Sequence, residues 1–231
     1  MGSMRREMKV RRGEKLGAIL WIVAPIQFLM SVAFTWLGWT TPYGLLTNTI
    51  SDLGAVGCGN WTSGAAQNGS SATSHYVCSP WHGLFNASII ILGLMSILGA
   101  MLLIRRFPPR PSSKAGLVMI AVGGFGSVGV GVFPEDVSII PHSIFALLQF
   151  VFGNLGLLTL GYAMVGQRVW RRYEVVTIAC GIVGLVALPL FLSGFWGPLG
   201  IGGSEWLIVG PELVWVPFAG IRLLQIPDST A

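Results

Sequence analysis

The chain has 231 residues, of which 53% are hydrophobic and only 10% are charged, and its mean hydropathy is +0.72. So few polar side chains could not cover the surface of a water-soluble fold of this size. The main solvent must therefore be lipid, and we predict an integral membrane protein. The net charge of +5 does not indicate a nucleic-acid partner, because the basic residues stand in short segments between apolar runs, where they set membrane orientation.

Six apolar segments are long enough to cross a membrane, since roughly 20 residues of α-helix span a hydrocarbon core about 30 Å thick. The predicted spans are approximately 16–39, 83–104, 115–133, 143–166, 175–196 and 206–224. The first is too long for the apolar core of a signal peptide, so we expect it to be retained. The predicted fold class is all-α: a polytopic bundle of six transmembrane helices over residues 16–224, with a basic segment at 1–15 and a tail at 225–231.

The basic residues are confined to alternate connections between these spans. Of the 14 Lys and Arg residues, six precede the first span, four lie between the second and third, three follow the fourth, and Arg222 ends the sixth. Positive charge near span ends stays preferentially in the cytoplasm. We therefore predict a protein of the cytoplasmic (inner) membrane with both termini in the cytoplasm and three connections on the outer face.

The first outer connection, residues 40–81, is the only long one. Its middle is rich in Gly, Ser, Asn and Thr, and it cannot bury enough apolar area to form a core of its own. Cys58 and Cys78 bracket this stretch, and a disulfide would close a loop of roughly 20 residues, worth about 3 kcal/mol in the chain-entropy model. We predict this bond, the alternative being two free thiols, and expect Cys180 in the fifth span to be a packing residue.

Ionisable side chains from four separate pieces of chain are expected at the same outer face. The candidate site residues are Asp52, His82, Asn86, Asp136, His142 and Glu205. Taken singly, each is explained by capping a helix end or pairing with another, which would seal the bundle against water. Together they indicate a pocket open to the outer leaflet. Glu212, about two turns deeper in the sixth span, needs a partner or a proton, because an intramembrane carboxylate is costly.

Two chemistries suit these residue types. His82, His142 and Asp136 are candidate Zn²⁺ ligands that would leave an open position for a water able to attack an ester or amide. Without a metal, a His–Asp pair could serve as general base, and Asn86 could stabilise an oxyanion. The spacing matches no strict metal motif such as H-E-x-x-H, so both possibilities stay open.

Four motifs resemble those of a known family. They are 50–54 (ISDLG), 79–86 (SPWHGLFN), 133–136 (FPED) followed by His142, and 203–207 (GSEWL). Their order and content are similar to the motifs of the domain-of-unknown-function family 998, which consists of bacterial and archaeal polytopic membrane proteins. The resemblance runs from the first span to the sixth and implies a fold and a polar site but no reaction. Trp206 stands where that family usually has arginine.

Two looser resemblances point toward lipids. The ISD and LFN pieces are similar to Frag/DRAM-type eukaryotic membrane proteins, which are linked to lipid handling and lipid-anchor remodelling. The ceramidase and adiponectin-receptor superfamily of intramembrane zinc hydrolases also uses Ser, Asp and His spread over several helices, but its H-x-x-x-H in the last helix is absent here.

The leading hypothesis is a protein whose outer pocket binds or processes a membrane lipid or lipid-linked headgroup, with metal-dependent hydrolysis as one form of the activity. One alternative is a proton-linked transporter of small molecules that uses Glu212 and the proline-containing fifth and sixth spans. Another is a non-enzymatic scaffold for envelope assembly that presents the long outer loop to a protein partner.

Overall fold

The computed structural model describes residues 12–63, 73–194 and 196–226. Within them, six helices are long and apolar enough to cross a membrane, which confirms the predicted all-α polytopic fold. The helices are α1 (Arg12–Leu37), α2 (His82–Leu103), α3 (Pro111–Val132), α4 (Ile139–Met164), α5 (Tyr173–Ser193) and α6 (Gly200–Gln225). The helix ends agree closely with the predicted spans except at α6, whose glycine-rich first turn is not apolar enough to be recognised by hydropathy.

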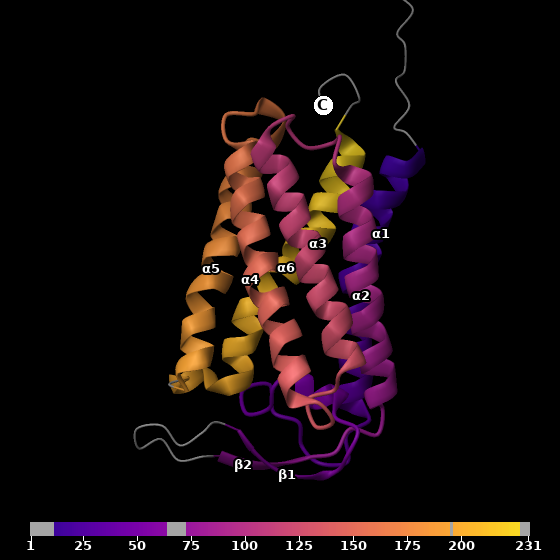
Figure 1. Ribbon diagram of the computed structural model, residues 1–231, viewed down its shortest axis with the longest axis vertical. Helices are drawn as coiled ribbons and strands as arrows, with labels where there is room; N and C mark the ends of the chain where they lie inside the picture. Colours follow the sequence, from indigo (N-terminus) through magenta and orange to yellow (C-terminus); the bar gives the residue numbers. More distant parts are fainter. Residues whose placement is uncertain (1–11, 64–72, 195, 227–231) are drawn as a thin grey trace, which may run out of the picture.

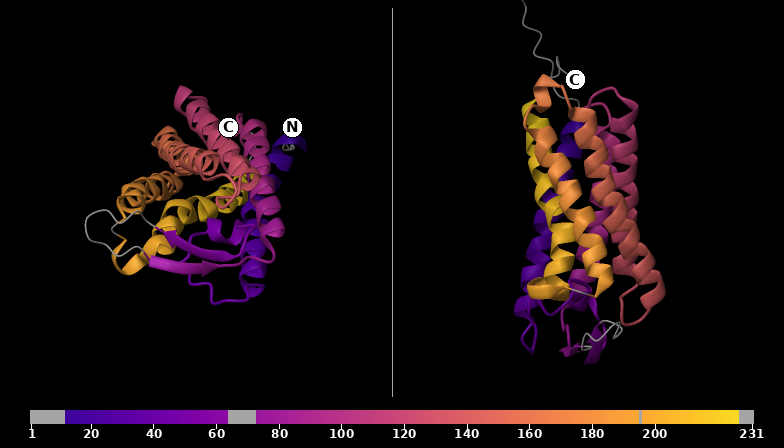
Figure 2. Two further views of the ribbon diagram at one scale, coloured as in Figure 1. Left: turned by 60° about the horizontal axis from the view of Figure 1, so that its bottom comes forward. Right: turned by 90° about the vertical axis from the view of Figure 1, so that its left-hand side faces the viewer.

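The helices form a closed ring in which each packs against its neighbours in sequence and α6 packs against α1 (Figures 1 and 2). Consecutive helices run antiparallel, so the connections alternate between two ends of the bundle. The end at which α1 begins and α6 ends is called the terminal end. The opposite end, drawn at the bottom of Figure 1, is called the hairpin end.

Every Lys and Arg of the described residues lies at the terminal end, where several arginines bind the carbonyl groups that helix ends leave unpaired. Arg106 donates to the carbonyl oxygens of Leu223 (2.8 Å) and Ile226 (2.5 Å). Arg222 donates to the carbonyl oxygen of Val169 (2.5 Å). These arginines therefore satisfy backbone carbonyl groups at the ends of helices, and the positive charge of the bundle is concentrated at one end.

Two apolar clusters fill the interior between these ends. The cluster nearer the terminal end includes Trp21, Phe107, Leu160, Trp170 and Trp215. The cluster nearer the hairpin end includes Phe28, Leu53, Phe85, Phe150 and Ile208. Because Leu53 belongs to the connection after α1, the second cluster anchors that connection to the helices.

The long connection contains regular structure that its composition does not predict. A short 3₁₀ helix, η1 (Ser51–Gly54), precedes the antiparallel strands β1 (Gly59–Ser63) and β2 (Thr73–Val77). The predicted disulfide between Cys58 and Cys78 is present and joins the base of this hairpin. Two five-residue strands are marginal alone in water, so the disulfide and contacts with the bundle take the place of a core.

Candidate functional site

The segment that follows α1 folds back beneath the bundle and packs against the start of α6. The N–H of Gly202 donates to the carbonyl oxygen of Leu46 (3.1 Å). A Cβ at Gly202 would collide with the carbonyl oxygen of Asn48, and one at Gly200, where φ is +64°, would collide with that of Leu46. Only glycine allows so close an approach, which brings η1 beside α6.

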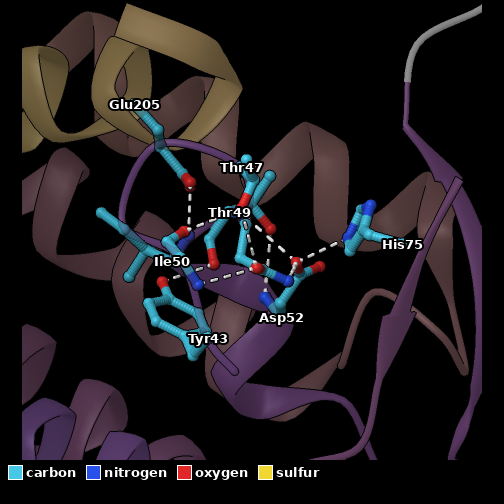
Figure 3. A network of polar contacts seen from close by, with 9 residues as sticks. Tyr43, Thr47, Thr49, Ile50, Asp52, His75 and Glu205 are labelled. Atoms are coloured by element: carbon cyan, nitrogen blue, oxygen red, sulfur yellow. Dashed lines mark hydrogen bonds and ion pairs between the residues drawn. The ribbon is translucent and has the colours of Figure 1, made fainter. Parts of the chain in front are cut away.

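Asp52 is the centre of a buried polar network in this segment (Figure 3). Its Oδ2 accepts hydrogen bonds from Asn48 Nδ2 (2.9 Å) and from the backbone N–H of Thr49 (3.2 Å). Its own backbone N–H donates to Thr49 Oγ1 (3.1 Å). His75 Nε2, from the hairpin, lies 2.9 Å from the same Oδ2. The carboxylate therefore joins η1 to the hairpin.

The hairpin presents one face to the bundle, and the residues just before β1 are held by Asp136. Trp61 and His75 are directly opposite each other in the strand register, so their side chains leave the same face of the hairpin. His75 contacts Asp52, and Trp61 lines the pocket described below. Asp136, between α3 and α4, accepts hydrogen bonds through Oδ2 from the N–H groups of residues 56–57 (2.8 and 2.6 Å).

His142 lies in the first turn of α4 and pairs with Ser51 of η1. Its Nδ1 is 2.8 Å from the carbonyl oxygen of Phe133, which can only accept, so Nδ1 carries the hydrogen of the ring. Nε2 lies 3.0 Å from Ser51 Oγ. In the neutral ring this nitrogen is the acceptor, and the serine hydroxyl donates to it. The backbone carbonyl thus fixes one tautomer of His142.

Glu205 lies in the second turn of α6 and is buried. Its Oε2 accepts a hydrogen bond of 2.6 Å from the backbone N–H of Ile50, immediately before η1. Figure 3 shows Glu205 pointing from the helix toward the Asp52 segment. The helix therefore contributes a carboxyl group to the same polar region.

The carboxyl groups of Asp52 and Glu135, both in connecting segments, have opposite pKa shifts. Burial raises the pKa of Glu135 well above its ordinary value, and the charge of Asp52 and a hydrogen bond with it raise it further. Burial acts in the same direction on Asp52, but hydrogen bonds with His75, Glu135 and Asn48 outweigh it, so the pKa of Asp52 is lowered. Burial, together with neighbouring carboxylates, raises the pKa of Tyr43. The arrangement therefore favours the protonated form of Glu135 and the ionised form of Asp52.

A pocket of about 320 Å³ adjoins these groups. Its polar floor includes Thr49, Ser51, Asp52, Glu135, His142 and Glu205. Its apolar wall includes Ile139, Leu147, Phe150, Phe191 and Leu192 from α4 and α5. Three of these wall residues, Ile139, Leu147 and Leu192, are 57%, 46% and 65% exposed. The pocket therefore joins buried polar groups to exposed apolar side chains.

Three of the six predicted site residues line this pocket, namely Asp52, His142 and Glu205. Asp136 lies beside it and holds backbone N–H groups. His82 Nδ1 donates to the carbonyl oxygen of Ser79 (2.8 Å), and Asn86 Nδ2 donates to that of Gly54 (2.9 Å). His82 and Asn86 thus bind backbone carbonyls outside the pocket lining and support the connecting segment from the side of α2.

Each candidate zinc ligand makes a backbone contact: His82 and His142 through Nδ1, and Asp136 through Oδ2. Across residues 12–63, 73–194 and 196–226, no group of three or more His, Cys, Asp and Glu side chains is placed to hold a metal ion. Glu212 has the partner that its depth requires, because Gln149 Nε2 donates to its Oε2 (3.0 Å). This pair lies deeper between the helices than the pocket.

Ser51, Glu135 and the role of His75 are parts of the site that the sequence does not predict. Ser51 and Glu135 each directly precede a predicted site residue, Asp52 and Asp136, and this adjacency is the signal in the sequence that could identify them. The position of His75 depends on a hairpin that the composition of the loop does not predict. Its contact with Asp52 is therefore visible only in three dimensions.

The fold and the site define a class of protein: a polytopic helical membrane protein with an amphipathic pocket at one end of its bundle. The chain belongs to the family described as Protein of unknown function (DUF998), whose sequence model matches residues 22–222. This confirms the resemblance drawn from its motifs. No curated protein and no solved structure matches the chain.

Proposed function

We propose that this protein binds a membrane lipid in the hairpin-end pocket, with the headgroup on the polar floor and the hydrocarbon chains along the apolar wall. The observation that carries the proposal is the continuity between buried polar groups and the exposed wall residues Ile139, Leu147 and Leu192. A ligand that satisfies both surfaces must itself be amphipathic, because an apolar molecule would leave buried polar groups unpaired.

The headgroup is one that donates hydrogen bonds. The floor offers the carboxyl groups of Asp52 and Glu205, and no Lys or Arg of the described residues lines the pocket. An anionic headgroup would meet these acids without a counter-charge, which is costly at a buried site. Hydroxyl or ammonium groups could pair with the same acids, and the Trp61 ring at the pocket could pack on a cation. The ligand class is therefore a lipid with an uncharged, hydroxyl-bearing headgroup or a cationic one.

The separation of charge supports the further proposal that this pocket lies at the level of the outer leaflet. All Lys and Arg of the described residues are at the terminal end, and such charge favours the cytoplasmic side. The hairpin end would then face away from the cytoplasm and take its lipid from the outer leaflet of the cytoplasmic membrane. A disulfide at this end suits an oxidising compartment.

Native mass spectrometry of the detergent-purified protein tests the proposal with three probes: a glycosyl diacylglycerol, a sphingoid base and phosphatidic acid. Loss of a charged or hydrogen-bonded pairing corresponds to about a tenfold change or more in affinity, so we expect the first two probes to bind at least that much more tightly than phosphatidic acid. Equal retention of phosphatidic acid would contradict the assignment of the headgroup.

A matched pair of variants locates the binding. Ala146→Trp fills the pocket, which Ala146 lines, and should abolish retention of the lipid. Ile144→Trp adds a similar side chain two residues away, where Ile144 is 56% exposed and is not part of the pocket lining, and should bind as the native protein does. Undiminished binding by Ala146→Trp would show that lipid is held elsewhere.

A further inference from the structure

Ser51 and His142 stand out among the pocket residues because their mutual geometry does more than hold the fold together. Ser51 begins η1, and His142 lies in the first turn of α4, 91 residues away in sequence. Both line the pocket, and Ser51 also lines the smaller apolar cavity next to it. Ser51 therefore borders the space into which a bound lipid would fit.

The hydrogen bonds of His142 show which ring nitrogen could accept a proton from Ser51. Nδ1–H donates to the Phe133 carbonyl, so the lone pair of Nε2 faces the Ser51 hydroxyl at 3.0 Å. A nucleophile next to a base that is itself oriented by a third group is the arrangement by which serine is activated in acyl transfer. Here the group that orients the imidazole is a backbone carbonyl and not a carboxylate. Asp52, the nearest acid in sequence, is turned toward His75 instead.

From this geometry we infer that Ser51 is the nucleophile of an esterase acting on the lipid in the pocket, with His142 as its general base. The inference rests on the proposed lipid binding and names the reaction that would follow it. The substrate class is a carboxylic ester whose acyl chain lies along the apolar wall. Thr49, Ser143 and Trp61 line the same pocket, and each carries a side-chain donor that could bind the carbonyl oxygen.

The reaction proceeds in two balanced steps. Ser51 Oγ forms a bond to the carbonyl carbon while its proton passes to His142 Nε2, and the carbonyl π electrons move to oxygen. The ester C–O bond then breaks, and the leaving alcohol takes the proton from His142. In the second step water attacks the acyl-serine, again giving its proton to His142, which returns it to Ser51 as the free acid is released.

A fluorophosphonate probe tests Ser51 without knowledge of the natural ester. Attack forms an Oγ–P bond, the P–F bond breaks, fluoride leaves and His142 takes the hydroxyl proton, so each reactive site gains one phosphonyl mass. We expect one adduct on the purified protein, mapped by peptide mass spectrometry to Ser51. Ser51→Ala should not be labelled, and His142→Ala should be labelled more slowly by about a hundredfold.

Controls separate reactivity from folding and from lipid binding. Ser193→Ala, at the same end of the bundle but outside the pocket lining, should be labelled as fast as the native protein. Each variant is compared by its size-exclusion profile, and Ser51→Cys supplies a second test, since it should react with a thiol-directed probe even if Ser51→Ala is unstable. Native protein that retains a glycosyl diacylglycerol but gives no Ser51 adduct would overturn the nucleophile and leave the binding proposal standing. A Ser51 adduct on protein that retains no lipid would support the nucleophile and overturn the binding.

Discussion

At the scale of single residues, the neighbouring carboxyl groups of Asp52 and Glu135 have pKa values shifted in opposite directions. The pKa of Glu135 is raised by burial and by the neighbouring Asp52, whereas hydrogen bonds lower that of Asp52. A raised folded-state pKa contributes stability that is present below the unfolded pKa and is lost as pH rises through the folded value. A lowered one contributes stability above the unfolded pKa that is lost as pH falls. The two acids therefore act on opposite sides of an optimum pH.

Glu135→Gln tests this arrangement, because glutamine keeps a hydrogen-bond donor toward Asp52 but cannot ionise. The native protein should lose stability as pH rises from about 4.3 toward the folded pKa of Glu135, by about 1.4 kcal/mol for each pH unit crossed. The variant should lack that loss, so its thermal unfolding midpoint relative to the native protein should increase with pH.

The matched change Glu174→Gln, at the terminal end of the bundle, should leave the pH profile of the native protein unaltered in the same range. Parallel profiles for the native protein and Glu135→Gln would show that Glu135 does not hold the proton.

The sequence predicts some of these residues better than others. The sequence predicts Asp52, His142 and Glu205 because an ionisable side chain near the end of a membrane span costs free energy unless it is paired or serves a function. His82 and Asn86 share that signal, yet they bind the backbone of the connecting segment. Which polar group faces a cavity depends on how the segment 43–54 folds beneath the helices, and no local pattern in the sequence specifies that path.

At the scale of elements, the glycine-rich start of α6 decides how closely the connecting segment approaches the helix. Gly202 faces the carbonyl oxygens of Leu45 and Asn48, and these backbone atoms cannot move aside as a side chain could. The same close packing places Ile50 where its N–H reaches Glu205. The turn that hydropathy did not recognise as helix is therefore the turn that positions the floor of the pocket.

Gly202→Ala should destabilise the protein by about 1–3 kcal/mol, as overpacking of a close contact does, and should weaken lipid retention as well. Gly83→Ala, in the first turn of α2, is the control, because a Cβ there meets nothing within 4 Å. It should be neutral or stabilising by up to about 1 kcal/mol through helix propensity. Equal unfolding midpoints for the two variants would show that the contact at Gly202 is not tight.

The helices themselves follow from span length and hydropathy, since lipid leaves the backbone few alternatives. The hairpin does not, because its strands are stabilised by the Cys58–Cys78 disulfide and by the contact between His75 and Asp52. The sequence predicts the disulfide, but the pairing of strands across it depends on contacts with a bundle that is distant in sequence.

At the scale of the whole molecule, the two ends of the bundle differ in chemistry. The terminal end holds the basic residues of the described chain, and the hairpin end holds a pocket lined by Asp52, Glu135, His142 and Glu205 together with exposed apolar side chains. The partition of Lys and Arg was evident from the sequence. The joining of polar floor to apolar wall was not, because it requires α4, α5, α6 and the connecting segment to meet.

The most direct test of lipid binding in the pocket is photocrosslinking in membranes with an uncharged glycolipid that carries a diazirine in its acyl chain. We predict saturable labelling of α4 and α5 at the pocket wall, around residues 139–150 and 191–192, which excess unlabelled lipid removes and which Ala146→Trp lacks. Labelling spread evenly over the exposed faces of the helices, neither competed by unlabelled lipid nor changed by Ala146→Trp, would contradict a lipid-binding pocket.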